Sequence, residues 1–219
     1  MPKKTGIIFL ITGAVLILSA LLLLLSNRQE DRRAGQEAQL LLAGIQSVLP
    51  PETEPTTALT ETPPDSTVST GPTAPPETLP AEMPVVVIDG YGCIGYLSIP
   101  DLGLELPVIS EWSYSSLEVA PCRHFGSSRT DDLVIAGHNY KTHFRSLSSL
   151  EEGAEILFTD MDGIENRYTV RRMDKLDPES VDAVQNSGYD LVLYTCTPGG
   201  ATRLAVFCDR VQENTLKSL

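Results

Sequence analysis

Apolar residues are concentrated in one uninterrupted run near the N-terminus. Residues 6–25 (GIIFLITGAVLILSALLLLL) carry no charge, and only Thr12 and Ser19 among them are polar. Twenty helical residues span about 30 Å, the thickness of the hydrocarbon core of a membrane. The run is longer than the apolar region of most signal peptides, and the charged sequence SNRQEDRR follows it in place of a small-residue cleavage site. We therefore predict an uncleaved membrane anchor over residues 1–27, with a cleaved signal peptide as the main alternative.

Short apolar runs that are typical of β-strands dominate the second half of the chain. The run DLVIAGH (132–138) is almost continuously apolar, as in a strand buried on both faces. The runs AEILFTD (154–160) and RYTVRRM (167–173) flank the residues MDG, which predict a hairpin turn. Further runs of strand character cover residues 93–99, 104–110, 190–196 and 203–211. The pattern thus predicts seven strands.

Helical signals in this half are few and short. Residues 177–185 begin with Asp177 as a candidate N-cap and Pro178 at the first helical position. Residues 112–120 and 141–150 have weaker helical patterns. Strands and helices do not alternate, and the sequence contains no Gly-rich phosphate-binding loop. The predicted fold class is therefore all-β, a β-barrel that carries short helices.

A proline-rich segment separates the anchor from the predicted strands. Residues 50–84 hold ten of the sixteen prolines and nine threonines, but no aromatic residue. Such a segment cannot bury enough apolar surface to fold, and as an extended chain of about 3.1 Å per residue it reaches roughly 100 Å. We predict a disordered extracytoplasmic linker over residues 28–84, which includes a short helix within residues 37–49, and a folded domain over residues 85–219.

Charge and cysteine spacing exclude several classes of function. Residues 85–219 contain 11 basic and 20 acidic side chains, within a chain whose net charge is −13. Such a surface repels nucleic acid, so we expect no nucleic-acid partner. The four cysteines form no CxxC pair, which excludes a zinc ribbon and a thioredoxin motif. We interpret Cys93, Cys122 and Cys208 as buried apolar side chains, although an extracytoplasmic domain would permit a disulfide among them.

Candidate chemistry lies where the apolar runs end. Cys196 ends one predicted strand, and Arg203 begins the next after Thr-Pro-Gly-Gly; His138 ends a third strand directly after a glycine. A guanidinium beside a thiol favours the nucleophilic thiolate and can stabilise an oxyanion. An imidazole can protonate a leaving amine and deprotonate an incoming one. Together the three side chains suffice for acyl transfer through a thioester, although each alone is also compatible with a structural role.

The other two histidines are interpreted as structural. His124 and His143 lie in predicted loop or helix segments, and the spacing between His138 and His143 fits no familiar ligand pattern. We therefore expect no metal and no cofactor.

The segments LVIAGHN (133–139) and LYTCTPGGATR (193–203) resemble the motifs of sortases, the membrane-anchored cysteine transpeptidases of Gram-positive bacteria. The similarity covers most of residues 91–211, agrees with the anchor and linker, and is greatest to class B and related clostridial branches. It implies an eight-stranded β-barrel, one strand more than the pattern predicts. It also implies catalytic roles for His138, Cys196 and Arg203, although Val192 stands where the family has the first threonine of its T-L-x-T-C motif.

The resemblance further implies the substrates and the location. A sortase cleaves a Leu-Pro-x-Thr-Gly-like sorting signal on a secreted protein and transfers that protein to an amine acceptor, here a cell-wall precursor or a pilin. Because sortases act outside the membrane, it implies a single-pass protein with a cytoplasmic N-terminus and an extracellular catalytic domain. We expect Thr195, Asn139 and Tyr140 to contact the substrate; for Thr195 and Tyr140, and likewise for Tyr194, packing in the barrel is the alternative.

Two other functions fit parts of the pattern. A cell-wall L,D-transpeptidase also uses an exported cysteine with an upstream histidine, but its cysteine usually lies in a Ser-x-Gly-Cys-x-Arg context, which YTCTPGG does not match. A non-catalytic, membrane-tethered β-domain that binds the cell wall would keep Cys196 as a structural thiol. Alkylation of the folded protein distinguishes the last function, because a structural thiol resists it.

Overall fold

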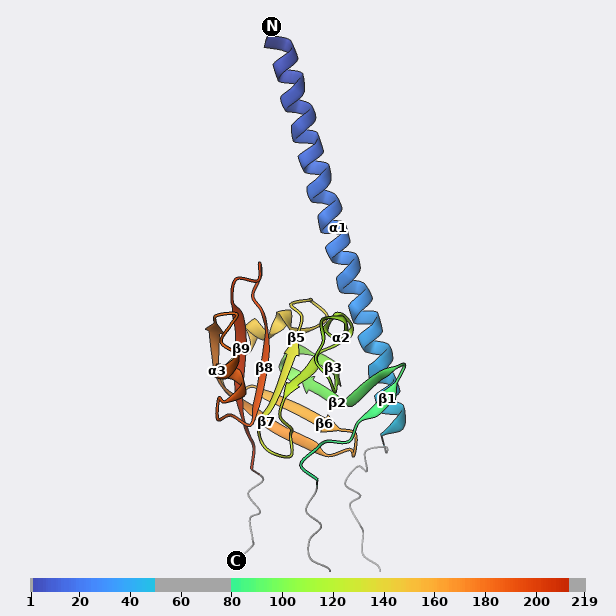
Figure 1. Ribbon diagram of the computed structural model, residues 1–219, viewed down its shortest axis with the longest axis vertical. Helices are drawn as coiled ribbons and strands as arrows, with labels where there is room; N and C mark the ends of the chain where they lie inside the picture. Colours follow the sequence, from blue (N-terminus) through green and yellow to red (C-terminus); the bar gives the residue numbers. More distant parts are fainter. Residues whose placement is uncertain (1, 50–79, 213–219) are drawn as a thin grey trace, which may run out of the picture.

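The computed structural model describes residues 2–49 and 80–212. The described residues form one long N-terminal helix, α1 (Pro2–Val48), and a sheet with small helices around it (Figure 1). The strands are β1 (Val86–Ile88), β2 (Tyr91–Ile99), β3 (Leu104–Ile109), β4 (Cys122–Phe125), β5 (Leu133–Gly137), β6 (Glu155–Asp160), β7 (Glu165–Leu176), β8 (Leu191–Cys196) and β9 (Arg203–Arg210). The small helices are η1 (Pro100–Leu102), α2 (Tyr114–Val119), η2 (Phe144–Ser149) and α3 (Val181–Gln185).

Strands β2 to β9 close into a barrel. Their order is β2-β3-β4-β5-β8-β9-β7-β6, and β6 pairs with β2 to complete the circle, while β1 pairs with residues 91–93 at the start of β2, before the part that pairs with β6. Two neighbouring pairs, β3–β4 and β5–β8, are parallel, and the other pairs are antiparallel. The predicted all-β class and the eight-stranded barrel with short helices are confirmed.

The strand that the sequence pattern misses is β4. It contains only four residues, CRHF, and three of them are partly exposed, so it has neither an apolar run nor an alternating pattern. The other missed strand, β1, has three residues and lies outside the closed circle. Both strands are held mainly by pairing with their neighbours, which a local pattern does not report.

Strand β5 is buried on both faces, as its continuous apolar run predicts. Leu133 and Ile135 belong to the main core inside the barrel. Val134 packs with Val184 of α3 on the outside, and Ala136 packs with Leu117 of α2 and with α1. The helices outside the barrel therefore cover the strand that leads to His138.

Helix α1 continues beyond the predicted end of the anchor at residue 27. Its N-terminal part, which contains residues 6–25, is exposed along its length and is apolar and long enough to cross a membrane. Its second part carries a stripe of small and apolar residues at helical spacing, Ala34, Ala38, Leu41 and Ile45, all buried against the barrel. Residues 28–48 thus belong to α1 rather than to the predicted linker. The predicted disordered segment over residues 50–79 lies outside the described residues.

The remaining predicted segments are found with different boundaries. Helix α2 lies within the predicted 112–120, where the Ser113 hydroxyl caps it by accepting from the Ser116 amide at 2.9 Å. The predicted helix over 177–185 begins only at Val181, because β7 extends to Leu176 and a turn follows it. Residues 144–149 form a 3-10 helix. The predicted hairpin turn between β6 and β7 is confirmed, and the Asp160 carboxylate accepts from backbone amides within it.

Candidate active site

Two parallel strands bring His138 and Cys196 to the same end of the barrel. In the β5–β8 pair Gly137 lies opposite Thr195, so the next residue on each strand is His138 on one side and Cys196 on the other. Neighbouring strands lie about 4.8 Å apart, which makes the two backbones adjacent although the residues are distant in sequence. Gly137 is required for close packing, because a Cβ there would lie 2.5 Å from the Phe144 ring.

The β8–β9 hairpin places Arg203 beside Cys196. Cys196 and Arg203 are partners across the last register position of this antiparallel pair. The connecting turn is closed by the Thr197 amide, which donates to the Thr202 carbonyl at 3.0 Å. The Arg203 guanidinium donates to the carbonyls of Gly200 at 3.1 Å and Thr202 at 3.3 Å. Among the described residues, no carboxylate forms an ion pair with Arg203.

The three residues line one cleft with a volume of about 350 Å³. Its aromatic lining residues come from the segment before α2, from the start of α2, from β4 and from β8; they are Trp112, Tyr114, His124 and Tyr194. Further lining residues are aliphatic and come from the segment that runs from the end of β7 into α3; they include Leu176, Pro178, Val181 and Val184. The lining of this cleft is mostly apolar with a few polar groups, as in ligand-binding clefts generally.

Cys196 differs from the other cysteines in its exposure. It is partly exposed at the cleft, whereas Cys93, Cys122 and Cys208 are buried, and all four are free thiols. Burial raises the pKa of Cys93 to about 11 and that of Cys122 to about 12, which keeps both thiols protonated at neutral pH. Cys196 is therefore the cysteine that is accessible for nucleophilic chemistry in the described part of the chain.

The environment of His138 favours the neutral imidazole. Burial lowers the pKa of His138 from its ordinary value, and the negative charge of Glu118 in α2 opposes this shift in part. A neutral imidazole can accept the proton of a thiol, which is the first requirement for a general base beside Cys196. Glu118 is a carboxylate whose proximity to His138 the sequence does not indicate, because α2 and β5 are brought together only by the fold.

Of the residues expected to contact substrate, only Thr195 lines this cleft. Thr195 is 3% exposed, and its hydroxyl has no hydrogen-bond partner among the described residues. The Asn139 carbonyl instead accepts from the Arg145 guanidinium, and Tyr140 faces a separate cleft of about 610 Å³ beside α1. That second cleft contains none of the three candidate catalytic residues.

Two further residues line the cleft: His124, which is interpreted as structural from the sequence, and Tyr194, for which the sequence leaves both the cleft and packing in the barrel open. The Tyr194 hydroxyl and His124 Nδ1 are 2.8 Å apart, and the His124 ring packs 5.3 Å from Trp112. Burial raises the pKa of Tyr194 to about 12, although the positive charge of Arg203 lowers it in part, and burial lowers the pKa of His124. His124 is missed from sequence because its strand, β4, has no recognisable pattern.

His143 is buried rather than in an ordinary loop position. It is 0% exposed, and burial, followed by the charge of His138, lowers its pKa to about 4, with the backbone of Ala34 and Val119 opposing the shift in part. Within the ranges that the structure describes, no group of three or more His, Cys, Asp or Glu side chains is arranged to hold a metal ion.

Comparisons with known proteins identify similar sequences and folds. Residues 97–211 match the family model of the sortase domain. Sortase A of Bacillus anthracis is 29% identical over 122 residues, which cover 53% of this chain and 58% of that protein. Sortase A from Corynebacterium diphtheriae has a similar structure, with a TM-score of 0.51 and 24% identity over 57% of this chain and 64% of that one. A sortase D5 transpeptidase from Clostridium perfringens matches with a TM-score of 0.49 and 21% identity, over 55% of this chain and 79% of that one.

The chain spans less than two thirds of the length of the first two of these relatives. The expected similarity to class B stays a prediction. The likeness to sortase A from Corynebacterium diphtheriae shows the fold, a closed barrel with short helices.

Proposed function

This chain belongs to the sortase family, whose model matches more than half of it, and from that premise we propose that it is a membrane-anchored cysteine transpeptidase. The substrates are secreted proteins with a Leu-Pro-x-Thr-Gly-like sorting signal, and the acceptor is an amine on a cell-wall precursor or on a pilin. No nucleic acid takes part. One observation carries the proposal: His138, Cys196 and Arg203 line a single cleft although they come from three different strand ends.

In the first half of the reaction, Cys196 forms a thioester with the substrate. The Cys196 thiol passes its proton to His138, and its sulfur attacks the carbonyl carbon of the threonine in the sorting signal. Negative charge develops on the carbonyl oxygen, where the Arg203 guanidinium and the backbone amide of Thr197 stabilise it. The peptide C–N bond then breaks, and His138 returns the proton to the leaving glycine amine.

In the second half, an amine resolves the thioester. The acceptor amine attacks the same carbonyl carbon, His138 takes its proton, and the C–S bond breaks as His138 passes that proton to the sulfur, which restores the Cys196 thiol. A new amide bond joins the secreted protein to the acceptor. No redox partner is required, because one amide is exchanged for another.

We propose the location from α1 and from the family resemblance. We place residues 6–25 in the membrane, the N-terminus in the cytoplasm and the barrel outside the cell. Helix α1 leaves the barrel at the end from which the β8–β9 connection projects (Figure 1), which supports an active-site cleft that faces the membrane surface. A substrate whose sorting signal lies close to the membrane is accessible to a cleft placed in this way.

The direct test is cleavage of fluorogenic peptides from a sorting-signal library by the full chain in detergent micelles. We expect cleavage of a Leu-Pro-x-Thr-Gly-like member, release of its glycine fragment and transfer to an added amine. Cys196→Ala should abolish cleavage, whereas Cys208→Ala, which alters a buried thiol away from the cleft, should retain the chemistry in the folded fraction. Cleavage at an unchanged rate by Cys196→Ala would remove the proposed nucleophile.

A further inference from the structure

The segment between β5 and η2 begins with His138 and is held in part by its own bonds and by η2. The His143 and Arg145 amides donate to the Tyr140 carbonyl, the Phe144 amide donates to the His138 carbonyl, and the Arg145 guanidinium donates to the Asn139 carbonyl. These bonds leave the amides of Lys141 and Thr142 at the tip of the turn without an acceptor inside the segment. Their acceptor decides how firmly the turn is held.

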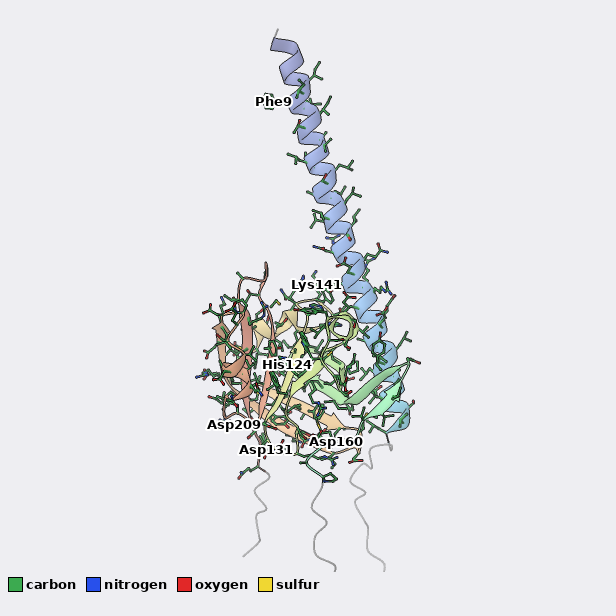
Figure 2. All side chains as sticks on the ribbon, viewed as in Figure 1. Phe9, His124, Asp131, Lys141, Asp160 and Asp209 are labelled. Atoms are coloured by element: carbon green, nitrogen blue, oxygen red, sulfur yellow. The ribbon has the colours of Figure 1, made fainter. Side chains whose placement is uncertain are left out.

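That acceptor is Asp31, in helix α1. One Asp31 carboxylate oxygen, Oδ1, accepts from the Lys141 amide at 2.7 Å and from the Thr142 amide at 3.4 Å. The Thr142 hydroxyl donates to the Asp31 backbone carbonyl at 3.0 Å. Figure 2 shows Lys141 beside α1, at the opposite end of the barrel from Asp131, Asp160 and Asp209. A residue before the proline-rich segment therefore completes the hydrogen bonding of the turn that follows His138.

The packing around this contact is close. A Cβ on Gly35 would lie 2.6 Å from the Thr142 methyl group, so only glycine allows α1 to approach the turn so closely. Ala34, one residue earlier, is buried at the same contact. The helix thus fits against the turn by shape as well as by hydrogen bonds.

This turn also contacts the imidazole of His138. The Tyr140 ring lies between two histidine rings, with its centroid 4.9 Å from that of His138 and 5.4 Å from that of the buried His143. A displacement of the turn therefore moves the aromatic group against which His138 packs. The distances form a continuous path from Asp31 through the turn to the candidate base.

We propose that Asp31 is a positioning residue for His138, and that the juxtamembrane part of α1 is a component of the catalytic domain rather than a tether. The proposal rests on the proposed transpeptidase function. It assigns to Asp31 no contact with substrate. Its effect is to hold the turn at residues 139–143 and, through Tyr140, the orientation of the imidazole.

The test uses the full chain in detergent micelles with three helix variants. Asp31→Ala removes the acceptor. Asp31→Asn keeps an amide oxygen that can accept the same bonds but removes the charge. Glu37→Ala is the matched control, because Glu37 is another α1 carboxylate whose hydrogen-bond partner is Arg33 on the same helix.

Peptide cleavage gives the first measurement. For Asp31→Ala we expect kcat to fall about ten- to a hundredfold, since misplacing a catalytic group by about 1 Å costs up to about 100-fold in rate. We expect KM to stay within about twofold, because the residues that line the cleft come from other elements. Asp31→Asn should recover most of this loss, and Glu37→Ala should match the parent chain. An unchanged kcat in Asp31→Ala, or an equal loss in Glu37→Ala, overturns the proposal.

Hydrogen exchange separates positioning from general destabilisation. We expect faster amide exchange in Asp31→Ala confined to residues 139–145, and no change in the barrel strands. If Asp31→Ala unfolds the domain, Thr142→Val takes its place, because it removes the hydroxyl donor while keeping the shape of the side chain. Slower turnover in that variant supports the proposal, and parental turnover overturns it.

A readout without turnover distinguishes this proposal from the function on which it rests. If the parent chain cleaves no peptide, the proposed function fails, but the alkylation rate of Cys196 by iodoacetamide still reports on His138. Asp31→Ala should slow alkylation towards the rate of His138→Ala. An alkylation rate equal to that of the parent chain overturns the positioning role.

Discussion

Replacing Arg203 with lysine keeps the positive charge at the mouth of the β8–β9 hairpin but removes the planar guanidinium. Arg203 lies opposite Cys196, and its Nη1 donates to the carbonyls of Gly200 at 3.1 Å and Thr202 at 3.3 Å. These bonds fix the group while its other N–H donors stay available for a substrate oxyanion. A lysine ammonium has its three donors on a single atom, so it cannot satisfy the turn carbonyls and an oxyanion in the same geometry.

The expected loss follows from the stabilisation of the oxyanion. Removing one donor from an oxyanion hole costs about 10²- to 10³-fold in kcat, or roughly 2.7–4 kcal/mol. Because the ammonium retains the charge, we expect Arg203→Lys to fall at the lower end, at about 100-fold. The loss should appear in kcat with KM nearly unchanged, since the interaction forms in the transition state. Fluorogenic peptide cleavage, with single-turnover measurement of thioester formation, separates the two constants.

Arg171→Lys provides the matched control. Arg171 lies on the exposed side of β7, where its contact is a surface ion pair with Asp209 at 3.0 Å, and surface pairs contribute little. We expect its kcat to stay within about twofold of the parent value. A parental kcat for Arg203→Lys would refute the oxyanion role, and a raised KM with unchanged kcat would make Arg203 a contact of the bound substrate instead.

Three further measurements follow from burial. Burial lowers the pKa of His138 below the usual histidine value of about 6.5, so its imidazole stays neutral to a lower pH. We therefore expect kcat/KM to fall on the acidic side only below about pH 6.5. A fall that begins above that pH contradicts this expectation. The fold favours the neutral form of His143 and lowers its pKa to about 4. The contribution of His143 to the free energy of unfolding is therefore complete above about pH 6.5, the pKa of an unfolded histidine. This contribution declines by at most about 3 kcal/mol as the pH falls to 4. Chemical unfolding across this range should show a shallower slope for His143→Gln. Ile45→Ala, at a site 0% exposed between α1 and the barrel, should lower the free energy of unfolding by about 2–4 kcal/mol, whereas a negligible change would mean that α1 contributes no packing there.

The positions of the candidate catalytic residues were accessible to sequence reasoning because each ends or begins an apolar run. His138 and Cys196 follow segments that are buried throughout or nearly so, and a polar residue at the end of such a strand lies at the rim of the core. Arg203 is placed by a short turn, so its pairing with Cys196 is a local property. Local patterns of this kind predict which residues lie at the rim of the core. The closed barrel then brings these residues to the same end of the molecule.

Contacts between distant segments were not accessible in this way. The stripe at Ala38, Leu41 and Ile45 is amphipathic, but the sequence does not show which surface covers it, because a proline-rich segment separates it from the barrel. In the same way, His124 lies on a strand of four residues that exists only through pairing with β5 and β3. The interaction energy in both cases is non-local, so no window of sequence reports it.

The parallel pairing of β5 and β8 is the feature on which the candidate active site depends. Antiparallel neighbours would place the ends of the two strands at opposite edges, whereas parallel neighbours place His138 and Cys196 at one edge, with β6, β7 and α3 in the connection between them. The register is as important as the direction, because a slip of one residue turns the side chains of a strand to the other face. The close packing of Phe144 on Gly137 opposes such a slip, since a slip of β5 would put a residue with a side chain at the position of Gly137, where a Cβ would lie 2.5 Å from the ring. A barrel with the same strands in another register would therefore lose the pair of side chains that the proposed chemistry requires.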